Sequence, residues 1–433
     1  MTQDFESAKK HFLDGVAAFE SGRCADAERE FLASLALMPG RVSTMTNLAA
    51  TRIKLFRPAE ALAVLEQALA VDPDNVDAWC HRGEALADLG RHDEALACFD
   101  HVVRAAGHPA LAWFHRASAL AALQRFEDAL AAFDRFLGLQ TDHAEGWFRH
   151  GQTLQRLDRH EQALASYAQA LALDPALALA WTNRGGILKD LRRPDEAAQA
   201  FRQAIVYGGD PELNGYLLAA VTGDAAPAAA PRQYVEGLFD DYATTFDEHL
   251  NHVLRYRAPA VLIDNLRDFD RRRFRLVLDL GCGTGQCGPL AKAIADRVDG
   301  VDVSAKMLEQ ARALGVYERL EQSDIVEYLQ AADQRHDLVL AADVFVYIGD
   351  LDPVFAGVRR VLDPGGVFCF SAELPDHDGD FELKPTLRYG QSERYLRALA
   401  RRHRFAVERV LRHPIREDQK QPVAGVYVFL TAA

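Results

Sequence analysis

The sequence Val277-Leu-Asp-Leu-Gly-Cys-Gly-Thr-Gly285 decides how the second half of this chain folds. The apolar run that ends at Leu280 predicts a buried strand, and the three alternating glycines after it predict a loop that a ligand can approach closely. An apolar helix is expected from about residue 286 to 295, and its free N–H groups would face whatever lies on the loop. This is the pattern of the first strand–loop–helix unit in a doubly wound α/β sheet, where such folds bind nucleotides.

Residue spacing narrows the choice of nucleotide. A dinucleotide-binding loop follows Gly-x-Gly-x-x-Gly, but the position three beyond Gly283 is Gln286. A P-loop needs Gly-Lys-Ser/Thr, which is absent here. Instead, Asp279 stands two residues before the glycines, and a second acid, Asp302, follows a short apolar run. A carboxylate at the end of a second strand can accept hydrogen bonds from ribose hydroxyls; alternatively, Asp302 only caps the next helix, as Ser304 is expected to do.

These residues resemble motif I and the acidic second strand end of the class I S-adenosylmethionine-dependent methyltransferases. The resemblance extends through the rest of the chain, where 320–324, 336–347 and 362–366 are similar to the third strand end, motif IV and the turn into the fifth strand. It implies a doubly wound, Rossmann-like sheet of seven strands and S-adenosylmethionine as the cofactor. A helix at 392–401 and strands at 406–413 and 423–430 are expected to complete the sheet. The cofactor residues implied in this way are Asp279, Gly281, Cys282, Gly283, Gly285, Asp302, Val303, Met307, Asp324, Ile325 and Ala342, with Met307 packing on the adenine ring.

The resemblance also implies where the methyl group is delivered. Asp343 and Tyr347, at the end of the fourth strand, are expected to face the sulfonium. An activated methyl donor needs mainly the alignment of a nucleophile, and a general base helps when the acceptor carries a proton. Asp343 is the expected base and Glu373, at the fifth strand's end, is the second candidate. Either residue could instead position the acceptor by hydrogen bonding.

The segment before the first strand, 232–250, predicts a helix with large apolar side chains every four residues. This face either packs on the catalytic domain or covers the cofactor as a lid. In the second case, Tyr234 and Tyr242 would close the pocket, as aromatic residues do in related methyltransferases.

The first half of the chain repeats with a period of 34 residues. A small residue and a bulky residue recur in each unit, which predicts two helices that cross closely at the small residue. This register resembles tetratricopeptide repeats, so residues 1–221 are expected to form about six repeats and a capping helix. An Ala/Pro-rich linker at 222–231 would separate this all-α solenoid from the α/β domain at 232–433. The small residues are Gly15, Ala49, Gly83, Ala117, Gly151 and Gly185, and the bulky ones are Phe31, Leu65, Phe99, Phe133, Tyr167 and Phe201.

A repeat solenoid presents an extended concave face, which suits a protein or peptide partner. Hydrogen-bonding side chains two positions before the small residue are expected to line this face, although solvent exposure alone would also explain their polarity. Phe114 and Phe148, one position earlier, are expected to be large apolar residues of the same groove. The polar positions are Asn47, His81, His115, Arg149 and Asn183.

The composition argues against several other classes. The 433 residues carry a net charge of −14 and neither half is basic, so we expect no nucleic-acid partner. No segment approaches the roughly 18 apolar residues of a membrane span, and the acidic start lacks the apolar core of a signal peptide. The six cysteines have neither disulfide-module nor zinc spacing, which predicts free thiols, no metal site and a cytoplasmic protein.

Three functions are compatible with the sequence. The first is a methyltransferase whose repeats recruit a protein or peptide acceptor. The second is a small-molecule methyltransferase that uses its repeats for assembly or localisation. The third is a non-catalytic repeat scaffold, which the three acids at 279, 302 and 324 argue against. The acceptor atom, the need for a base and the oligomeric state do not follow from the sequence.

Overall fold

The computed structural model describes residues 2–105, 110–243, 245–266, 273–418 and 420–433. Its contacts divide the chain into two compact units, Met1–Ile187 and Leu188–Ala433. Helix α11 (Ala178–Asp190) crosses this division, and the next two helices, α12 (Pro194–Val206) and α13 (Pro211–Thr222), belong to the second unit. The contacts therefore divide the chain earlier than the predicted boundary at 222–231. That residues 232–433 fold by themselves remains a prediction.

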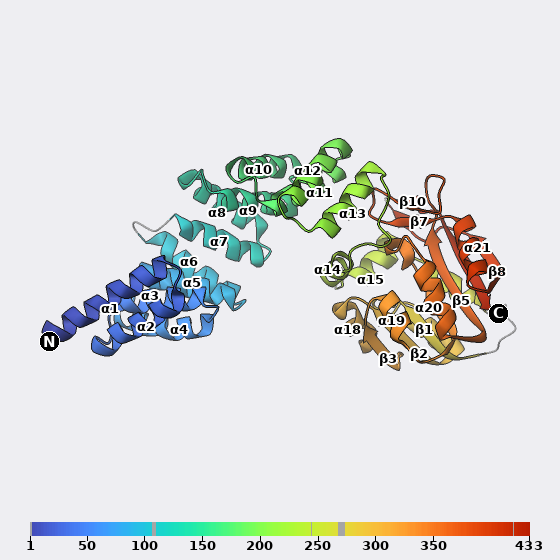
Figure 1. The fold of residues 1–433 in the computed structure, drawn as a ribbon, viewed down its shortest axis with the longest axis horizontal. Helices are drawn as coiled ribbons and strands as arrows, with labels where there is room; N and C mark the ends of the chain where they lie inside the picture. Colours follow the sequence, from blue (N-terminus) through green and yellow to red (C-terminus); the bar gives the residue numbers. More distant parts are fainter. Residues whose placement is uncertain (1, 106–109, 244, 267–272, 419) are drawn as a thin grey trace. The chain divides into compact units, whose positions relative to one another are not determined.

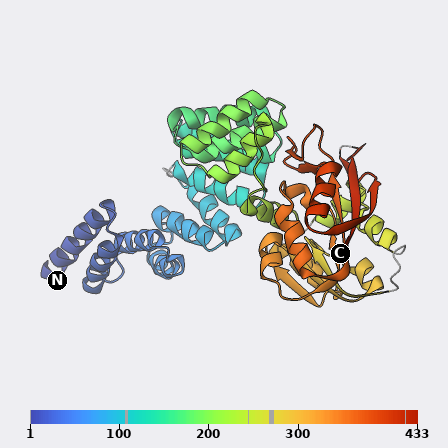
Figure 2. The same cartoon turned by 45° about the vertical axis from the view of Figure 1, so that its right-hand side comes forward.

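The first unit consists of helix pairs that follow one another along the chain (Figures 1 and 2). From α1 to α10, each helix packs on the next one. From α2 onward, helices two places apart in the chain begin about 34 residues apart, as the repeat predicts. The helices are α1 (Thr2–Glu20), α2 (Cys24–Leu37), α3 (Val42–Lys54), α4 (Pro58–Val71), α5 (Val76–Asp88), α6 (His92–Arg104), α7 (Leu111–Ala122), α8 (Phe126–Leu139), α9 (Ala144–Arg156), α10 (His160–Leu173) and α11.

The small residue of each repeat lies against the bulky residue of the following helix. A Cβ atom added at Gly83 would lie 2.6 Å from Cε1 of Phe99, and one added at Gly151 would lie 2.7 Å from Cε1 of Tyr167. Both rings are buried, so the two helices of a repeat approach closely only because these positions carry little or no side chain. The predicted role of the small residues as crossing points is confirmed.

The prediction that Phe148 belongs to an exposed apolar groove is wrong, whereas the place of Phe114 in such a groove remains a prediction. Phe148 is only 4% exposed and its ring packs on Tyr167, 6.0 Å away between centroids. Phe114 is half-buried and its ring contacts Phe133 and Phe136 of the next helix. Both rings fill the interface between neighbouring helices, which removes more apolar surface from water than a groove would.

The polar residues of the predicted concave face contact other residues of the same unit. His81 and His115 approach the same carboxylate, that of Glu84, at 2.9 and 3.3 Å. Asn47 donates to the backbone of its own helix, and Arg149 bonds a glutamate one turn earlier. Asn183 reaches the hydroxyl of Tyr167 at 3.4 Å. Apart from Arg149, which is exposed, these side chains are half-buried, and their binding of a partner remains a proposal.

The second unit contains a mostly parallel sheet of seven strands, which confirms the predicted doubly wound fold. The strand order is β3-β2-β1-β4-β5-β11-β8, and β11 is antiparallel to both of its neighbours. The order changes direction between β1 and β4, which is where open α/β sheets bind ligands. The strands are β1 (Phe274–Leu280), β2 (Ala295–Asp302), β3 (Arg319–Gln322), β4 (His336–Ala341), β5 (Leu362–Glu373), β8 (Phe405–Arg412) and β11 (Gly425–Ala432).

Both faces of this sheet are covered by apolar clusters. Leu278 and Val339 belong to one cluster, whereas their neighbours Val277 and Leu338 belong to the other. This alternation follows from the two-residue period of a strand, and it explains why β1 and β4 are apolar throughout. The helices of the unit's sheet region are α16 (Ala258–Leu266), α17 (Gly288–Ile294), α18 (Ala305–Ala313), α19 (Ile325–Ala331), α20 (Asp352–Val361) and α21 (Glu393–Arg402).

Two elements differ from the sequence expectation. The single helix predicted at 232–250 is broken into α14 (Arg232–Tyr242) and the short α15 (Phe246–Glu248), followed by a π-helical turn at His249–Val253. Thr245, at the break, is β-branched and has a ψ of −1°. Small hairpins were also not expected; they pair β6 (Phe381–Leu383) with β7 (Tyr389–Gln391), and β9 (Glu417–Asp418) with β10 (Gln421–Pro422).

The Ala/Pro-rich stretch before α14 is bonded to the segment that follows β4. The carbonyl of Ala228 accepts from the N–H groups of Gly349 and Asp350 at 2.8 and 2.9 Å, and the N–H of Ala230 donates to Tyr347. Ala229 and Ile348 form an antiparallel bridge. The stretch therefore holds a fixed position on the second unit.

Replacing Gly83 with valine should lower the free energy of unfolding by about 1–3 kcal/mol, because the buried Phe99 ring has no free volume to move into. Alanine is a weaker test, since Ala117 already stands at the equivalent position opposite Phe133. Thermal unfolding followed by circular dichroism measures the effect. Gly186→Val is the matched control, because a Cβ there meets no atom within 4 Å. Equal melting temperatures for the two variants would contradict the packing argument.

Candidate active site

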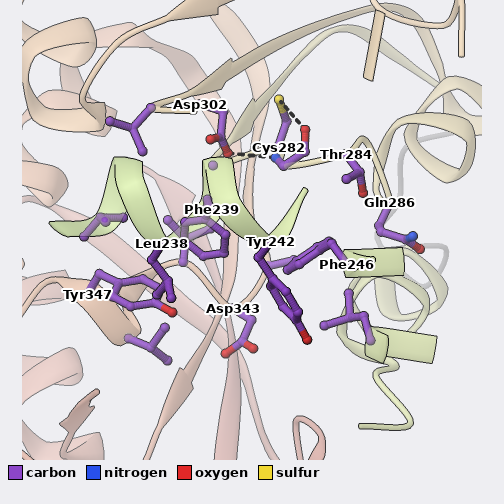
Figure 3. A pocket seen from close by; sticks show the side chains of 18 of the residues that line it. Leu238, Phe239, Tyr242, Phe246, Cys282, Thr284, Gln286, Asp302, Asp343 and Tyr347 are labelled. Atoms are coloured by element: carbon purple, nitrogen blue, oxygen red, sulfur yellow. Dashed lines mark hydrogen bonds between the residues drawn. The ribbon is translucent and has the colours of Figure 1, made fainter. Parts of the chain in front are cut away.

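A pocket of about 650 Å³ lies at the C-terminal ends of β1, β2 and β4. Its wall consists of the loops that follow these strands, the start of α19, the segment 232–250 (the lid segment) and two arginines, Arg388 and Arg416. Figure 3 shows Asp302 and Cys282 on one side of this pocket and Asp343 on the other, with Leu238, Phe239 and Tyr242 between them. The pocket therefore has two acidic sides separated by apolar and aromatic side chains.

The glycines of the loop after β1 have different physical roles. All three have positive φ, a conformation that favours glycine. A Cβ at Gly281 would lie 2.6 Å from Val344, and a Cβ at Gly285 would lie 2.7 Å from Leu314, so these two allow neighbouring segments to pack closely. A Cβ at Gly283 would meet no atom within 4 Å. Gly283 is thus the position at which the loop backbone is open to the pocket.

Asp302 connects the ends of β1 and β2. Its Oδ2 accepts from the N–H of Gly283 at 2.8 Å, and its Oδ1 accepts from the N–H of Ser304 at 2.9 Å. Burial raises the pKa of Asp302, whereas these backbone N–H groups act in the opposite direction. Ser304 itself caps α18 by accepting from the N–H of Met307, so the capping role belongs to Ser304 and leaves Asp302 facing the pocket.

The next side of the pocket is formed by the start of α19. Asp324 caps this helix, because one of its oxygens accepts from the N–H groups of Val326 and Glu327. Ile325 and Val303 add apolar surface to the same region of the wall. This part of the pocket offers a flat apolar ligand two hydrophobic contacts and one neighbouring carboxylate.

Asp343 lies at the opposite side, just after β4. Its φ is +58°, an uncommon conformation that aspartate tolerates and that is frequent at functional sites. Its Oδ2 is bonded to Arg416, whose second terminal nitrogen is bonded to Glu373. The Arg416 side chain is 2% exposed. Its single positive charge balances only one of the two carboxylates that it contacts. Oδ1 of Asp343 is buried and has no hydrogen-bond partner among the described residues.

Aromatic hydroxyl groups complete this side of the pocket. Tyr256 donates to the carbonyl of Ala342 at 3.0 Å, and burial raises its pKa well above the usual range. Burial also raises the pKa of Tyr347, and the positive charge of Arg388 acts in the opposite direction. The ring of Tyr347 meets Phe239 of α14 edge-on at 5.4 Å. Both tyrosines therefore stay protonated near neutral pH, and the proton of Tyr256 is already donated to Ala342.

The lid segment is attached to the pocket mainly by hydrogen bonds. None of the residues of α14 is buried. Asp240 accepts from the hydroxyl of Ser304 at 2.5 Å, and Asp247 accepts from Thr284 and Gln286 at 2.5 and 2.8 Å. Two aspartates of the lid segment thus bind the loops after β1 and β2.

Most of the residues predicted for the site are found in the pocket wall. Tyr242 from the lid segment and both motif IV residues are among them. The predicted residues that line the pocket are Gly281, Cys282, Gly283, Asp302, Val303, Asp324, Ile325, Ala342, Asp343, Tyr347 and Tyr242.

Five predicted residues do not line the pocket. Asp279 is 1% exposed and accepts from the hydroxyl of Tyr317, and burial raises its pKa to about 7. Met307 is fully buried in α18, whereas Val303 before the helix lines the pocket. Glu373 is buried beneath Arg416, and Gly285 serves packing. The ring of Tyr234 turns towards Tyr216 of α13, at 5.6 Å between centroids.

Sequence reasoning did not identify Asp240, Asp247, Tyr256 or Arg416 as site residues. Each of them reaches the site from a distant part of the chain: Asp247 is 37 residues from Thr284, and Arg416 is 73 residues from Asp343. No local spacing signals such contacts, because they depend on how the segments pack together. The order of strands in a doubly wound sheet indicates only which strand ends meet.

With this geometry in place, comparison with known proteins identifies two kinds of domain. Residues 277–366 match the model of a methyltransferase domain. Residues 46–109, 88–144 and 148–213 match the model of a tetratricopeptide repeat. The chain thus combines tetratricopeptide repeats with a methyltransferase domain.

Individual relatives cover only part of the chain. It is 30% identical over 145 residues to the malonyl-[acyl-carrier protein] O-methyltransferase of Enterobacter lignolyticus, covering 34% of this chain and 55% of that protein. The enzyme of the same name from Geobacter sulfurreducens is 39% identical over 120 residues, covering 26% and 43%. The chain spans about half the length of the curated relatives it matches.

Solved structures show more distant likeness. An S-adenosylmethionine-dependent methyltransferase from Clostridium acetobutylicum is 18% identical, covers 45% of this chain and 99% of its own, and has a TM-score of 0.35. YrrB, a TPR protein with an unusual peptide-binding site, is 21% identical, covers 41% of this chain and 92% of its own, and has a TM-score of 0.36.

Among the described residues, no helix is long and apolar enough to cross a membrane, and no group of side chains suits a metal ion.

Asp247→Ala should loosen the lid segment, because it removes the acceptor shared by Thr284 and Gln286. Each lost hydrogen bond is worth about 0.5–1.5 kcal/mol, so amide hydrogen exchange over residues 232–250 should become at least about threefold faster. Mass spectrometry of peptic fragments measures this. Glu248→Ala, an exposed neighbour in the same segment, is the control. If the two variants exchange alike, other contacts hold the lid segment.

Proposed function

We propose that this protein is an S-adenosylmethionine-dependent methyltransferase that acts on an acceptor carried by a protein or peptide. The observation that carries the first part is Asp302, a buried carboxylate that faces the pocket beside an open glycine. It is supported by the match to a methyltransferase domain and by the site's position where the strand order changes direction.

The residues present fit the proposed cofactor. Each oxygen of Asp302 accepts one backbone N–H and can accept a further hydrogen bond, which suits a pair of ribose hydroxyls. Val303 and Ile325 would contact an adenine ring, with Asp324 beside its amino group. Gly283 would allow the rest of the molecule to lie against the loop backbone. The lid segment would cover the bound molecule and exclude water.

On the opposite side, the chain's own residues would hold the acceptor. S-adenosylmethionine supplies an activated methyl group when bound. Asp343 would accept a hydrogen bond, or a proton, from the nucleophile through Oδ1, since Oδ2 is bonded to Arg416. Arg416 holds the orientation of that carboxylate, and Glu373 holds Arg416 through its other terminal nitrogen. Tyr256 and Tyr347 would offer neutral hydroxyl groups to polar parts of the acceptor.

Two observations support an acceptor that is carried by a protein. The relatives are named for O-methylation of a malonyl group borne by acyl carrier protein. The repeats belong to a class of scaffold whose concave surface binds extended chains.

Arg388, which lines the pocket without a carboxylate within ion-pair distance among the described residues, would favour an anionic acceptor group. A free metabolite with repeats used for assembly is the alternative.

Asp302→Ala should weaken the binding of S-adenosylmethionine or its demethylated product at least about tenfold. The reason is the loss of charge-assisted hydrogen bonds to the ribose, each worth about 1.5–3 kcal/mol. Isothermal titration calorimetry measures the dissociation constants. Asp296→Ala, on the exposed part of the same strand, is the control and should bind normally. An unchanged constant for Asp302→Ala would remove this residue from the cofactor site, and no binding by the unaltered protein would refute the function.

Transfer of labelled methyl groups to a fractionated lysate tests the acceptor. We expect label in macromolecules for the full chain, and none for Asp343→Asn despite normal cofactor binding. A protein that begins at Leu188 should label the same acceptor with a raised KM and a similar kcat, because remote contacts act equally on the ground and transition states. Label that enters only small molecules, or equal kcat/KM with and without residues 1–187, would favour the metabolite alternative.

A further inference from the structure

Helix α13 contacts the turn next to Arg388 through one buried tyrosine. Tyr216 of α13 is fully buried within the second unit. Its hydroxyl group donates to the carbonyl of Leu387 at 2.6 Å, a residue 171 positions later in the chain. The hydroxyl is therefore committed to the turn that joins β6 to β7.

That turn has a constrained backbone. Leu387 has a φ of +61°, which is uncommon for a residue with a branched side chain. Its N–H donates to the carbonyl of Lys384, and the N–H of Lys384 donates to the carbonyl of Arg388, both at 2.9 Å. The hydrogen bond from Tyr216 stabilises the Leu387 carbonyl in this conformation. The conformation in turn determines the direction of the next side chain, that of Arg388.

Arg388 and Tyr347 both line the pocket, where burial raises the pKa of Tyr347 and the positive charge of Arg388 lowers it. The turn is also fixed from its other end, because the hydroxyl of Tyr389 donates to the carbonyl of Pro227 at 2.9 Å. The rings of Tyr389 and Tyr234 both pack near Tyr216, at 6.2 and 5.6 Å. Tyr216 thus contacts the Arg388 turn and the first turn of the lid segment at the same time.

We propose that Tyr216 is a positioning residue that holds Arg388 at the acceptor side of the pocket. This inference rests on the proposed function, since Arg388 is useful only if an acceptor binds there. It assigns the capping helix of the repeats a second role besides closing the solenoid.

Tyr216→Phe removes the hydroxyl group and keeps the ring, so packing on Tyr234 and Tyr389 is retained. With malonyl-acyl carrier protein as the probe acceptor, we expect KM to rise about three- to tenfold while kcat and cofactor affinity stay within twofold, which corresponds to one lost hydrogen bond. Arg388→Ala should raise KM at least as much. The double variant should be no worse than Arg388→Ala alone, because Tyr216 acts through Arg388.

Tyr207→Phe, a partly exposed tyrosine after α12, is the matched control and should behave as the unaltered protein. Additive effects of the two changes, or an unchanged KM in Tyr216→Phe, would overturn the proposal. Hydrogen exchange over residues 384–391 gives a reading that does not depend on catalysis, and it should be at least threefold faster in Tyr216→Phe. If the unaltered protein binds no cofactor, the proposed function is refuted. If hydrogen exchange over residues 384–391 is the same in Tyr216→Phe as in the unaltered protein, the positioning role is refuted, whatever the result for the cofactor.

Discussion

The hydrogen bond from the Gly283 N–H to Asp302 is the contact on which the second unit's pocket depends. It links the loop after β1 to the end of β2, and the N–H of Cys282 reinforces the link by donating to the carbonyl of Val301. Gly283 has a positive φ, a conformation that glycine adopts without the steric cost of a Cβ atom. The same carboxylate receives a second N–H from Ser304, so the start of α18 is oriented by it as well. One side chain therefore sets the positions of two loops and a helix.

A second constraint lies on the opposite side, where Arg416 is enclosed between Asp343 and Glu373. Burial of three charged groups is unfavourable unless they are paired, and removal of one partner would leave a buried charge without compensation. Lys384 lies 3.9 Å from Glu373 and partly balances the remaining negative charge. This arrangement fixes Asp343 rigidly although its backbone conformation is uncommon. Rigid placement of one carboxylate oxygen suits a reaction in which alignment supplies most of the rate.

The fold was predictable because its signals are local and periodic. The 34-residue repeat fixes which residues cross at Gly83 and Phe99, and the apolar run before Gly281 fixes the first strand of the sheet. The lining of the pocket was predictable only where it follows directly from strand ends, as at Asp302 and Asp343. Met307 and Phe148 were misplaced because the exposure of a helical side chain depends on which neighbour packs on that face. Arg416 and Asp247 were missed because their partners are tens of residues away.

The absence of any buried residue in α14 has a thermodynamic consequence. Apolar surface that stays exposed in the folded protein can still be removed from water by a ligand, and its removal lowers the heat capacity. A ligand that fills the pocket would cover Leu238, which is 39% exposed, and Phe239, and would remove their surface from water together with its own. The heat capacity change of binding would then be more negative than the size of the ligand alone implies, and the binding enthalpy would depend steeply on temperature. At the temperature where the binding enthalpy passes through zero, the free energy of binding would come almost wholly from entropy.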